Sequence, residues 1–208
     1  MLASASPRRR DLLTQAGYAF EVIPAEVCED LQPGEQPIPY VLRLAREKAE
    51  AVAGSAEVLA LAAGAADSAI VLGADTTVVA PNGEILGKPE NDADAARMLR
   101  LLSAATHQVI TGVAVAAGGA TEVAVEVTHV TFAWMSDEEI AGYIASGEPH
   151  GKAGAYAIQG RAARWIPRIH GCYFNVVGLP LALATSMIEG ARQRIAVEAA
   201  AQLFARGV

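Results

Sequence analysis

The sequence is poor in cysteine, and Cys28 and Cys172 are the only two among its 208 residues. Two cysteines are too few for a disulfide framework or for a cysteine-based zinc site. The four histidines show no close spacing that would indicate a zinc site either. We therefore interpret the cysteines as buried or idle thiols and the histidines as structural residues. The histidines are His107, His129, His150 and His170.

Aromatic residues are also scarce, at 5% of the chain, whereas hydrophobic residues make up 52%. The interior must therefore consist mainly of Ala, Val, Leu and Ile. This composition is typical of a globular protein and excludes a disordered one. A chain of 208 residues fits one domain or two closely apposed lobes, and we expect a single domain spanning residues 1–208.

An excess of positive charge is absent, because the formal net charge is −7 and the isoelectric point is near 5.1. A sequence-independent nucleic-acid binder needs a broad basic surface, so we expect no nucleic-acid polymer as a partner. A small anionic ligand stays compatible with this charge, because it needs only a local positive cluster.

Long apolar runs are absent as well. None reaches the roughly 18 to 20 residues of a membrane span, and Gly178 and Pro180 interrupt the longest run, residues 176–188. Near the N-terminus, arginines occupy positions 8–10, where a secretory signal would have its apolar stretch. We therefore expect a soluble cytoplasmic protein without a membrane partner.

Strand-like and helix-like patterns alternate along the chain, which predicts an α/β protein with a mixed sheet. The Asn82-Gly83 pair marks a hairpin, and Ser136 with Glu139 forms a capping box. Residues 54–68 could form a helix or a linker. The predicted strands are about 70–80, 84–86, 108–117 and 121–134, and residues 164–177 should contain strand or irregular structure. The predicted helices are about 40–53, after a loop at 31–39, then 92–102, 136–147 and 179 onward.

The N-terminal segment reads as a short strand followed by a helix, with Ser6 as its N-cap and Pro7 in its first turn. Arg8 and Arg9 then lie at the positive end of the helix dipole, which is unfavourable by a few tenths of a kcal/mol. A bound anion would reverse this balance, because hydroxyls, backbone N–H groups and guanidinium groups all donate to phosphate oxygens. The alternative is a solvated basic turn.

Lys48 falls within the apolar stripe of the predicted helix 40–53. The side chain could extend along the apolar surface to reach solvent, or its ammonium could enter a cleft and meet an anionic ligand.

Asp75 follows an apolar strand, where an unpaired carboxylate costs several kcal/mol. A two-residue hairpin loop places Lys88 opposite Thr77, diagonal to Asp75, and a loop one residue longer places it opposite Thr76. In either register a carboxylate and an ammonium meet at the sheet end. The pair could be purely structural or part of a site.

Glu29 and Asp30 lie between a strand-like segment at residues 20–23 and the proline-rich loop. Acidic loop residues are usually solvated. However, Mg²⁺ needs only one or two carboxylates when substrate phosphates complete its ligands, so Glu29 and Asp75 would suffice.

Six segments together resemble the Maf family in order and spacing, from Leu2 to about Ile188. The resemblance implies a mixed, twisted sheet flanked by helices, as in inosine triphosphatase, with two lobes around a nucleotide cleft. It also implies a house-cleaning nucleoside triphosphate pyrophosphatase, a divalent metal (Mg²⁺ or Mn²⁺) and a homodimer. The segments are Ser4-Ala5-Ser6-Pro7-Arg8-Arg9, Arg46-Glu47-Lys48-Ala49, Leu72-Gly73-Ala74-Asp75-Thr76, Gly87-Lys88-Pro89, Lys152 to Gly160, and Asn175-Val176-Val177-Gly178-Leu179-Pro180.

The resemblance also implies roles for individual residues. Glu29 and Asp75 match the acidic pair that holds the metal, and Asp75 matches the proton acceptor. Arg8, Thr76 and Gln159 look like the dTTP/UTP branch of the family and not like the 7-methyl-GTP branch. The positions that grip the triphosphate are matched by Ser4, Ser6, Arg8, Arg9, Lys48 and Lys88.

The chain departs from the family pattern at residues 160–167, where Arg161 and Arg164 make the sequence more basic. Two functions from other classes remain open at this point. One is a regulator that binds nucleotide without turnover, in line with the family's association with septum formation and arrest of cell division, and the other is a structural protein. Binding alone does not require an inward carboxylate, so Asp75 favours an enzyme.

Overall fold

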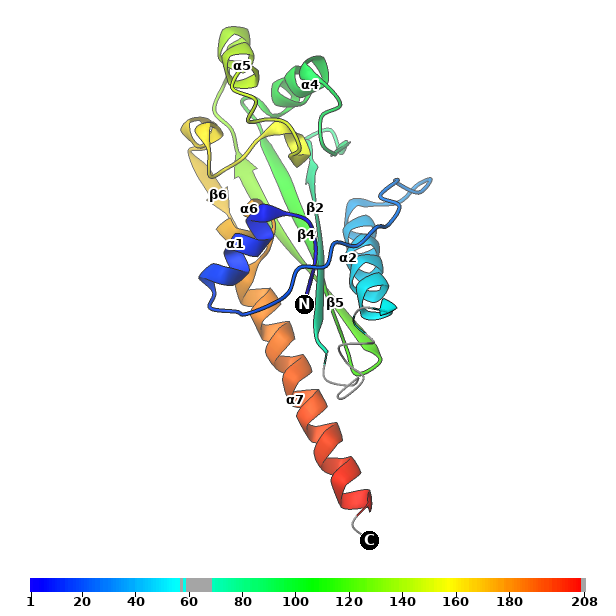
Figure 1. The fold of residues 1–208 in the computed structure, drawn as a ribbon. Coiled ribbons are helices and arrows are strands. Elements are labelled where there is room, and N and C mark those ends of the chain that lie inside the picture. Colours follow the sequence, from blue (N-terminus) through cyan, green and yellow to red (C-terminus); the bar gives the residue numbers. More distant parts are fainter. Residues whose placement is uncertain (57, 59–68, 207–208) are drawn as a thin grey trace.

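The computed structural model describes residues 1–56, 58 and 69–206. Its centre is a six-stranded sheet in the order β1-β2-β4-β5-β6, with β3 paired to β2 (Figure 1). This arrangement confirms the mixed α/β sheet flanked by helices. The strands are β1 (Leu2–Ala3), β2 (Val71–Val79), β3 (Ile85–Leu86), β4 (Thr106–Ala117), β5 (Ala120–Thr131) and β6 (Arg168–His170).

The edge of β2 that faces away from β4 is only partly paired. At one end β1 runs parallel to it, with Ala3 opposite Gly73, and at the other end β3 runs antiparallel to it, with Leu86 opposite Val78. Within the described residues, no strand pairs with residues 74–77 on this side. The sheet therefore has an open stretch of edge between β1 and β3.

Helices cover both faces of the sheet, and Figure 1 shows α1 and α2 on opposite sides of it. Helix α4 and helix α5 lie together at one end, and α7 runs past the other end. The helices are α1 (Pro7–Gln15), α2 (Pro37–Ala53), α4 (Asp92–Leu102), α5 (Asp137–Ile144), α6 (Tyr173–Val177) and α7 (Leu181–Arg206), with 3-10 turns η2 (Ala153–Ala155) and η3 (Arg161–Trp165).

Helix α2 lies unusually close to the sheet because two glycines face it. A Cβ on Gly73 of β2 would fall on the carbonyl oxygen of Ala45, and a Cβ on Gly112 of β4 would fall on that of Val41. The helix therefore rests on bare backbone, and its side chains reach the strands with little intervening space.

Several local predictions are confirmed. Helix α4 has the predicted bounds, and Ser136 and Glu139 form the capping box of α5. Ser6 caps α1 through the backbone N–H of Arg9, with proline in the first turn. The β4–β5 hairpin turns through Gly118 and Gly119, both with positive φ.

Other predictions need correction. Helix α2 begins at Pro37 instead of residue 40, because proline lacks only an N–H group that is unpaired in the first turn anyway. The strand-like residues 20–23 form a single bridge, from Val22 to Leu2. Residues 164–177 contain the helix α6 besides β6. The helix-or-linker alternative for residues 54–68 falls mostly outside the described residues. No helix in the described part of the chain is long and apolar enough to cross a membrane.

Candidate active site

The open stretch of the β2 edge borders a cleft of about 610 Å³. Its walls come from the segment after β1, the start of α1, helix α2 and the loops that follow β3 and η2. The structure brings together every residue that the sequence predicts for the site. These residues are Ser4, Ser6, Arg8, Arg9, Glu29, Lys48, Asp75, Thr76, Lys88 and Gln159.

The cleft reaches both faces of the sheet. Successive side chains of a strand point to opposite faces, so Asp75 points toward α2 and its neighbour Thr76 points toward α1. Because no strand covers this edge in the described structure, one ligand can touch both side chains. The site therefore consists of an acidic group on one face and a guanidinium group on the other.

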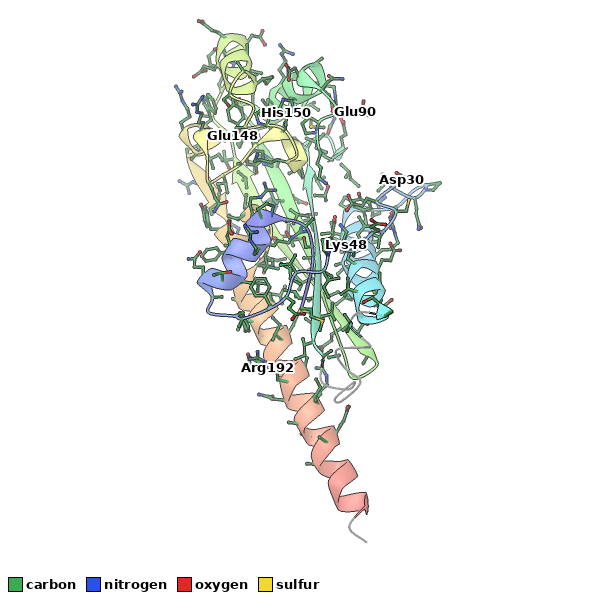
Figure 2. All side chains as sticks on the ribbon, in the orientation of Figure 1. Asp30, Lys48, Glu90, Glu148, His150 and Arg192 are labelled. Carbon is green, nitrogen blue, oxygen red and sulfur yellow. The ribbon has the colours of Figure 1, made fainter. Side chains whose placement is uncertain are left out.

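On the α2 face, Lys48 joins two carboxylates. Its Nζ donates to Asp75 Oδ1 at 2.7 Å and to Glu29 Oε1 at 2.5 Å. Lys48 is 7% exposed and Asp75 is 9% exposed, and Figure 2 marks Lys48 on α2. The ammonium enters the cleft, as one of the two sequence-based alternatives proposes, and does not extend to solvent.

The hairpin next to β2 has the longer of the two loops considered. Ala80 N–H donates to Glu84 O at 2.9 Å, which leaves three residues, 81–83, in the loop. The ladder ends at Leu86, so Lys88 does not pair with β2, and two other pairs replace the expected meeting of Asp75 with Lys88. Asp75 binds Lys48, and Lys88 Nζ lies 3.9 Å from Glu29 Oε2. Sequence spacing within the hairpin could not reveal that Lys48, from helix α2, is the partner of Asp75.

The protonation of Glu29 depends on its cationic neighbours. Burial alone would raise the pKa of Glu29, but the hydrogen bond and charge of Lys48, with the charges of Lys88 and Arg9, lower it below 4.5. Tyr40, at the start of α2, donates its hydroxyl to the backbone oxygen of Glu29 at 2.9 Å. The Glu29 carboxylate is thus held ionised and in place.

This pKa shift predicts how Glu29 contributes to stability. A carboxyl whose pKa is lowered in the folded state stabilises that state above its ordinary pKa, and the contribution is lost as the pH falls through the lowered value. We expect Glu29→Gln to have a lower Tm than wild type at pH 7, with the difference shrinking below pH 4.5. Thermal unfolding at both pH values measures this, with Glu26→Gln in the same loop as control. A difference that does not change with pH would contradict the charge-based account.

On the opposite face, protein acceptors bind three of the five N–H groups of the Arg9 guanidinium. Its Nε donates to Gly178 O at 2.8 Å, its Nη1 to Ser4 Oγ at 3.1 Å and its Nη2 to Thr76 Oγ1 at 3.0 Å. Burial lowers the pKa of Arg9, and the charge of Asp75 works against this shift. The idea that Arg9 is poorly placed without an anion is therefore wrong, because these three acceptors fix its guanidinium group in the free protein.

Arg8 and Lys152 add two further cations. Arg8 Nε donates to Val177 O at 3.2 Å, and burial lowers its pKa. Lys152 also lines the cleft, and its Nζ donates to Glu148 O at 2.6 Å. The sequence-based site residues omit Lys152 and Tyr40, although a lysine in a loop rich in glycine is a signal that could have found Lys152.

The charge of the cleft is opposite to that of the chain. Five cationic and two anionic side chains line the cleft, which leaves it a net charge of about +3, whereas the whole chain carries −7. Such a concentration of guanidinium and ammonium groups favours a ligand with several negative charges, such as a polyphosphate.

The two carboxylates fit a hard divalent cation. An oxygen of Glu29 and an oxygen of Asp75 lie within hydrogen-bond distance of one nitrogen, so both converge on the position that this ammonium takes. In the described part of the chain, no group of three or more acidic, histidine or cysteine side chains could hold a metal alone. Oxygens from a bound phosphate would complete the coordination, as is common for Mg²⁺.

Comparison with known proteins agrees with this site. The family model described as "Maf-like protein" matches residues 1–191. A "dTTP/UTP pyrophosphatase" of Koribacter versatilis is 50% identical over 191 residues, covering 92% of this chain and 93% of the relative. A protein of the same name from Anaeromyxobacter dehalogenans is 48% identical over 195 residues, covering 92% and 93%. One from Salmonella typhimurium is 52% identical over 180 residues, covering 86% of each chain. With its arginines, lysines and paired carboxylates assembled in one cleft and the match extending over most of its length, the chain belongs to the Maf family.

Proposed function

We propose that this chain is a nucleoside triphosphate pyrophosphatase that hydrolyses dTTP and UTP to the monophosphate and pyrophosphate. The observation that carries the proposal is the buried Asp75 carboxylate, which Lys48 holds inside a cleft of positive net charge. The names of the relatives support the same reaction. The role would be house-cleaning of the nucleotide pool, which fits a cytoplasmic enzyme.

The cations of the cleft bind the triphosphate. Arg9 binds the hydroxyls of Ser4 and Ser6, and Arg8 lines the same cleft, so backbone and side-chain donors can meet phosphate oxygens there. Lys48 and Lys88 approach from the α2 side, and Lys152 is a further cation that the ligand can recruit. Because Arg9 is fixed before binding, little conformational freedom is lost when it meets the phosphates.

A divalent metal, Mg²⁺ or Mn²⁺, belongs to this proposal, with Glu29 and Asp75 as its protein ligands. When bound, it would polarise the phosphate and lower the charge that an attacking water must approach. The Lys48 ammonium now lies where both carboxylates converge, so it would shift toward the phosphates. Lys48 thus holds the two carboxylates close together in the free protein.

Asp75 is the proposed acceptor of the proton of the attacking water. It is anchored on a central strand, and Lys48 binds only its Oδ1 in the described structure, so Oδ2 remains for water. Attack at the α-phosphorus by this water would form nucleoside monophosphate, with pyrophosphate as the leaving group.

Base selection is assigned to Arg8, Thr76 and Gln159. Gln159 follows the wall residues Ala157 and Ile158, and its amide can both donate and accept. Uracil and thymine offer N3–H and O4, whereas cytosine reverses that pattern. A turned amide could still accommodate cytosine, so discrimination against CTP is partial, and pocket size limits purines.

We therefore expect dTTP and UTP to have the highest kcat/KM, CTP to be intermediate and 7-methyl-GTP to be poor. Gln159→Ala should reduce the preference for UTP over CTP by about three- to ten-fold, the worth of one hydrogen bond, while changing pyrophosphate inhibition little. Parallel assays with dTTP, UTP, CTP, GTP and 7-methyl-GTP, with product identification, measure this.

A clear lead for 7-methyl-GTP would overturn the base assignment. Release of phosphate instead of pyrophosphate would overturn the reaction, and tight nucleotide binding without turnover would favour a regulator.

We also propose that the chain forms one domain and a homodimer, as the family resemblance implies. Light scattering on the purified protein measures the second of these directly.

A further inference from the structure

A line of hydrogen bonds leads from Arg9 away from the cleft into the core. Arg9 Nη2 lies 3.0 Å from Thr76 Oγ1, which lies 2.9 Å from Thr111 Oγ1 of β4. Thr111 Oγ1 in turn donates to the backbone oxygen of Asn175 at 3.2 Å. Thr111 and Asn175 are 0% exposed, and Thr111 is not among the residues that line the cleft.

The distances favour one set of hydrogen-bond directions along this line. A guanidinium group only donates and a carbonyl oxygen only accepts, whereas a hydroxyl has one proton. With the Thr111 proton on the oxygen of Asn175 at 3.2 Å, which is shorter than the 3.4 Å from Thr76 to Gly178, Thr111 accepts from Thr76. Thr76 accepts from Arg9 and gives its single proton to Thr111, in preference to the oxygen of Gly178 at 3.4 Å.

The far end of the line is fixed to the sheet. The Asn175 amide donates to Val109 O and to Thr128 Oγ1, each at 2.9 Å, which ties α6 to β4 and β5. Thr128 Oγ1 also donates to Cys172 O at 3.1 Å and accepts from Cys172 N at 3.0 Å. The acceptor that Thr111 uses therefore cannot move independently of the strands.

We propose that Thr111 is a positioning residue that orients the Thr76 hydroxyl and, through it, the Arg9 guanidinium. Because Thr111 takes the proton of Thr76, the Thr76 hydroxyl can offer a ligand only a lone pair. The cleft thus presents Thr76 as a hydrogen-bond acceptor and Arg9 in one fixed direction. This inference rests on the proposed function and adds a residue outside the cleft to it.

Thr111→Val tests the proposal because valine has nearly the shape of threonine but neither donates nor accepts. The variant should fold, since the oxygen of Asn175 keeps the N–H of Gly178 at 3.0 Å as a partner. Loss of one hydrogen bond of about 1 kcal/mol corresponds to a rise of about five-fold in KM for UTP, with kcat changed less. Thr111→Ser, which restores the hydroxyl, should recover wild-type KM.

A double-mutant cycle separates positioning from a general packing effect. If Thr111 acts through Thr76, then Thr111→Val should change KM little when Thr76→Val is already present. The matched control is Thr106→Val, because Thr106 lies on the same strand and forms an equivalent 2.9 Å pair with Thr131 at the surface. It should leave KM unchanged.

The outcomes also distinguish this inference from the proposed function. A wild-type protein without pyrophosphatase activity would overturn the proposed function itself. An active wild type whose KM is unaffected by Thr111→Val would overturn the inference alone, as would an effect of Thr111→Val that persists in full beside Thr76→Val or is not rescued by serine.

Discussion

Asp75→Asn is expected to lower kcat for UTP by about 10²- to 10⁴-fold, the usual contribution of a general base, while the chain stays folded. Asparagine keeps the volume of the side chain, and Glu29 still pairs with Lys48, so the Tm should fall less than in Lys48→Met. It cannot take a proton from water. Steady-state kinetics and thermal unfolding of the same preparation measure both effects.

This result must be compared with that of a control variant that loses a carboxylate outside the cleft. Asp30→Asn removes a carboxylate from the exposed loop that carries Glu29, and Asp30 does not line the cleft. It should keep wild-type kinetics. If Asp75→Asn retained more than about a tenth of wild-type kcat, a loss below about 1.4 kcal/mol, Asp75 would not be the base.

Lys48→Met is expected to damage both activity and stability. Methionine keeps the apolar stem of lysine but has no ammonium group, so the Asp75 and Glu29 carboxylates lose the cation between them. Breaking a buried ion pair costs roughly 3 kcal/mol, the lower end of its range because Glu29 is partly exposed, and this lowers the Tm by about 6–12 °C in a chain of this length. Loss of one fixed phosphate donor should lower kcat/KM by about 10²- to 10³-fold.

Divalent cations should partly reverse the loss of stability in Lys48→Met. With the ammonium removed, Mn²⁺ can bind between Glu29 and Asp75 without competition, so it should raise the Tm of the variant more than that of wild type. Arg46→Met, on the same helix but with an exposed side chain, is the control for a lost cation. If Mn²⁺ raised the Tm of Lys48→Met and of wild type equally, this would contradict a metal site formed by these two carboxylates.

Local signals predicted the elements well where short-range chemistry decides them. Ser6 and the Ser136–Glu139 pair cap helices because their side chains bond backbone groups three residues away. The inward position of Lys48 followed from helical periodicity, which places residues by angle alone. The resemblance to a known family supplied the members of the site, and the structure places all of them in one cleft.

Pairings between distant segments could not be predicted in this way. Nothing local to the hairpin reveals that Lys48, and not Lys88, binds Asp75, because the two partners lie 27 positions apart. The glycines at 73 and 112 are unremarkable in sequence, and their meaning depends on the helix that lies over them. The gap in the β2 edge arises from two very short strands whose lengths no periodicity defines.

The bond from Arg9 to Gly178 spans 169 positions, and this has a consequence for how the protein matures. Contacts between such distant segments form late, since the chain must first lose the entropy of closing a long loop. During synthesis, Arg9 is made early, but its acceptor, Gly178, is added only when most of the chain has been synthesised. In a partly folded or truncated intermediate, Arg9 would therefore lack its acceptor at Gly178. Under the proposed role of Arg9, such a species would not hydrolyse nucleotides, and activity would appear only once folding is complete.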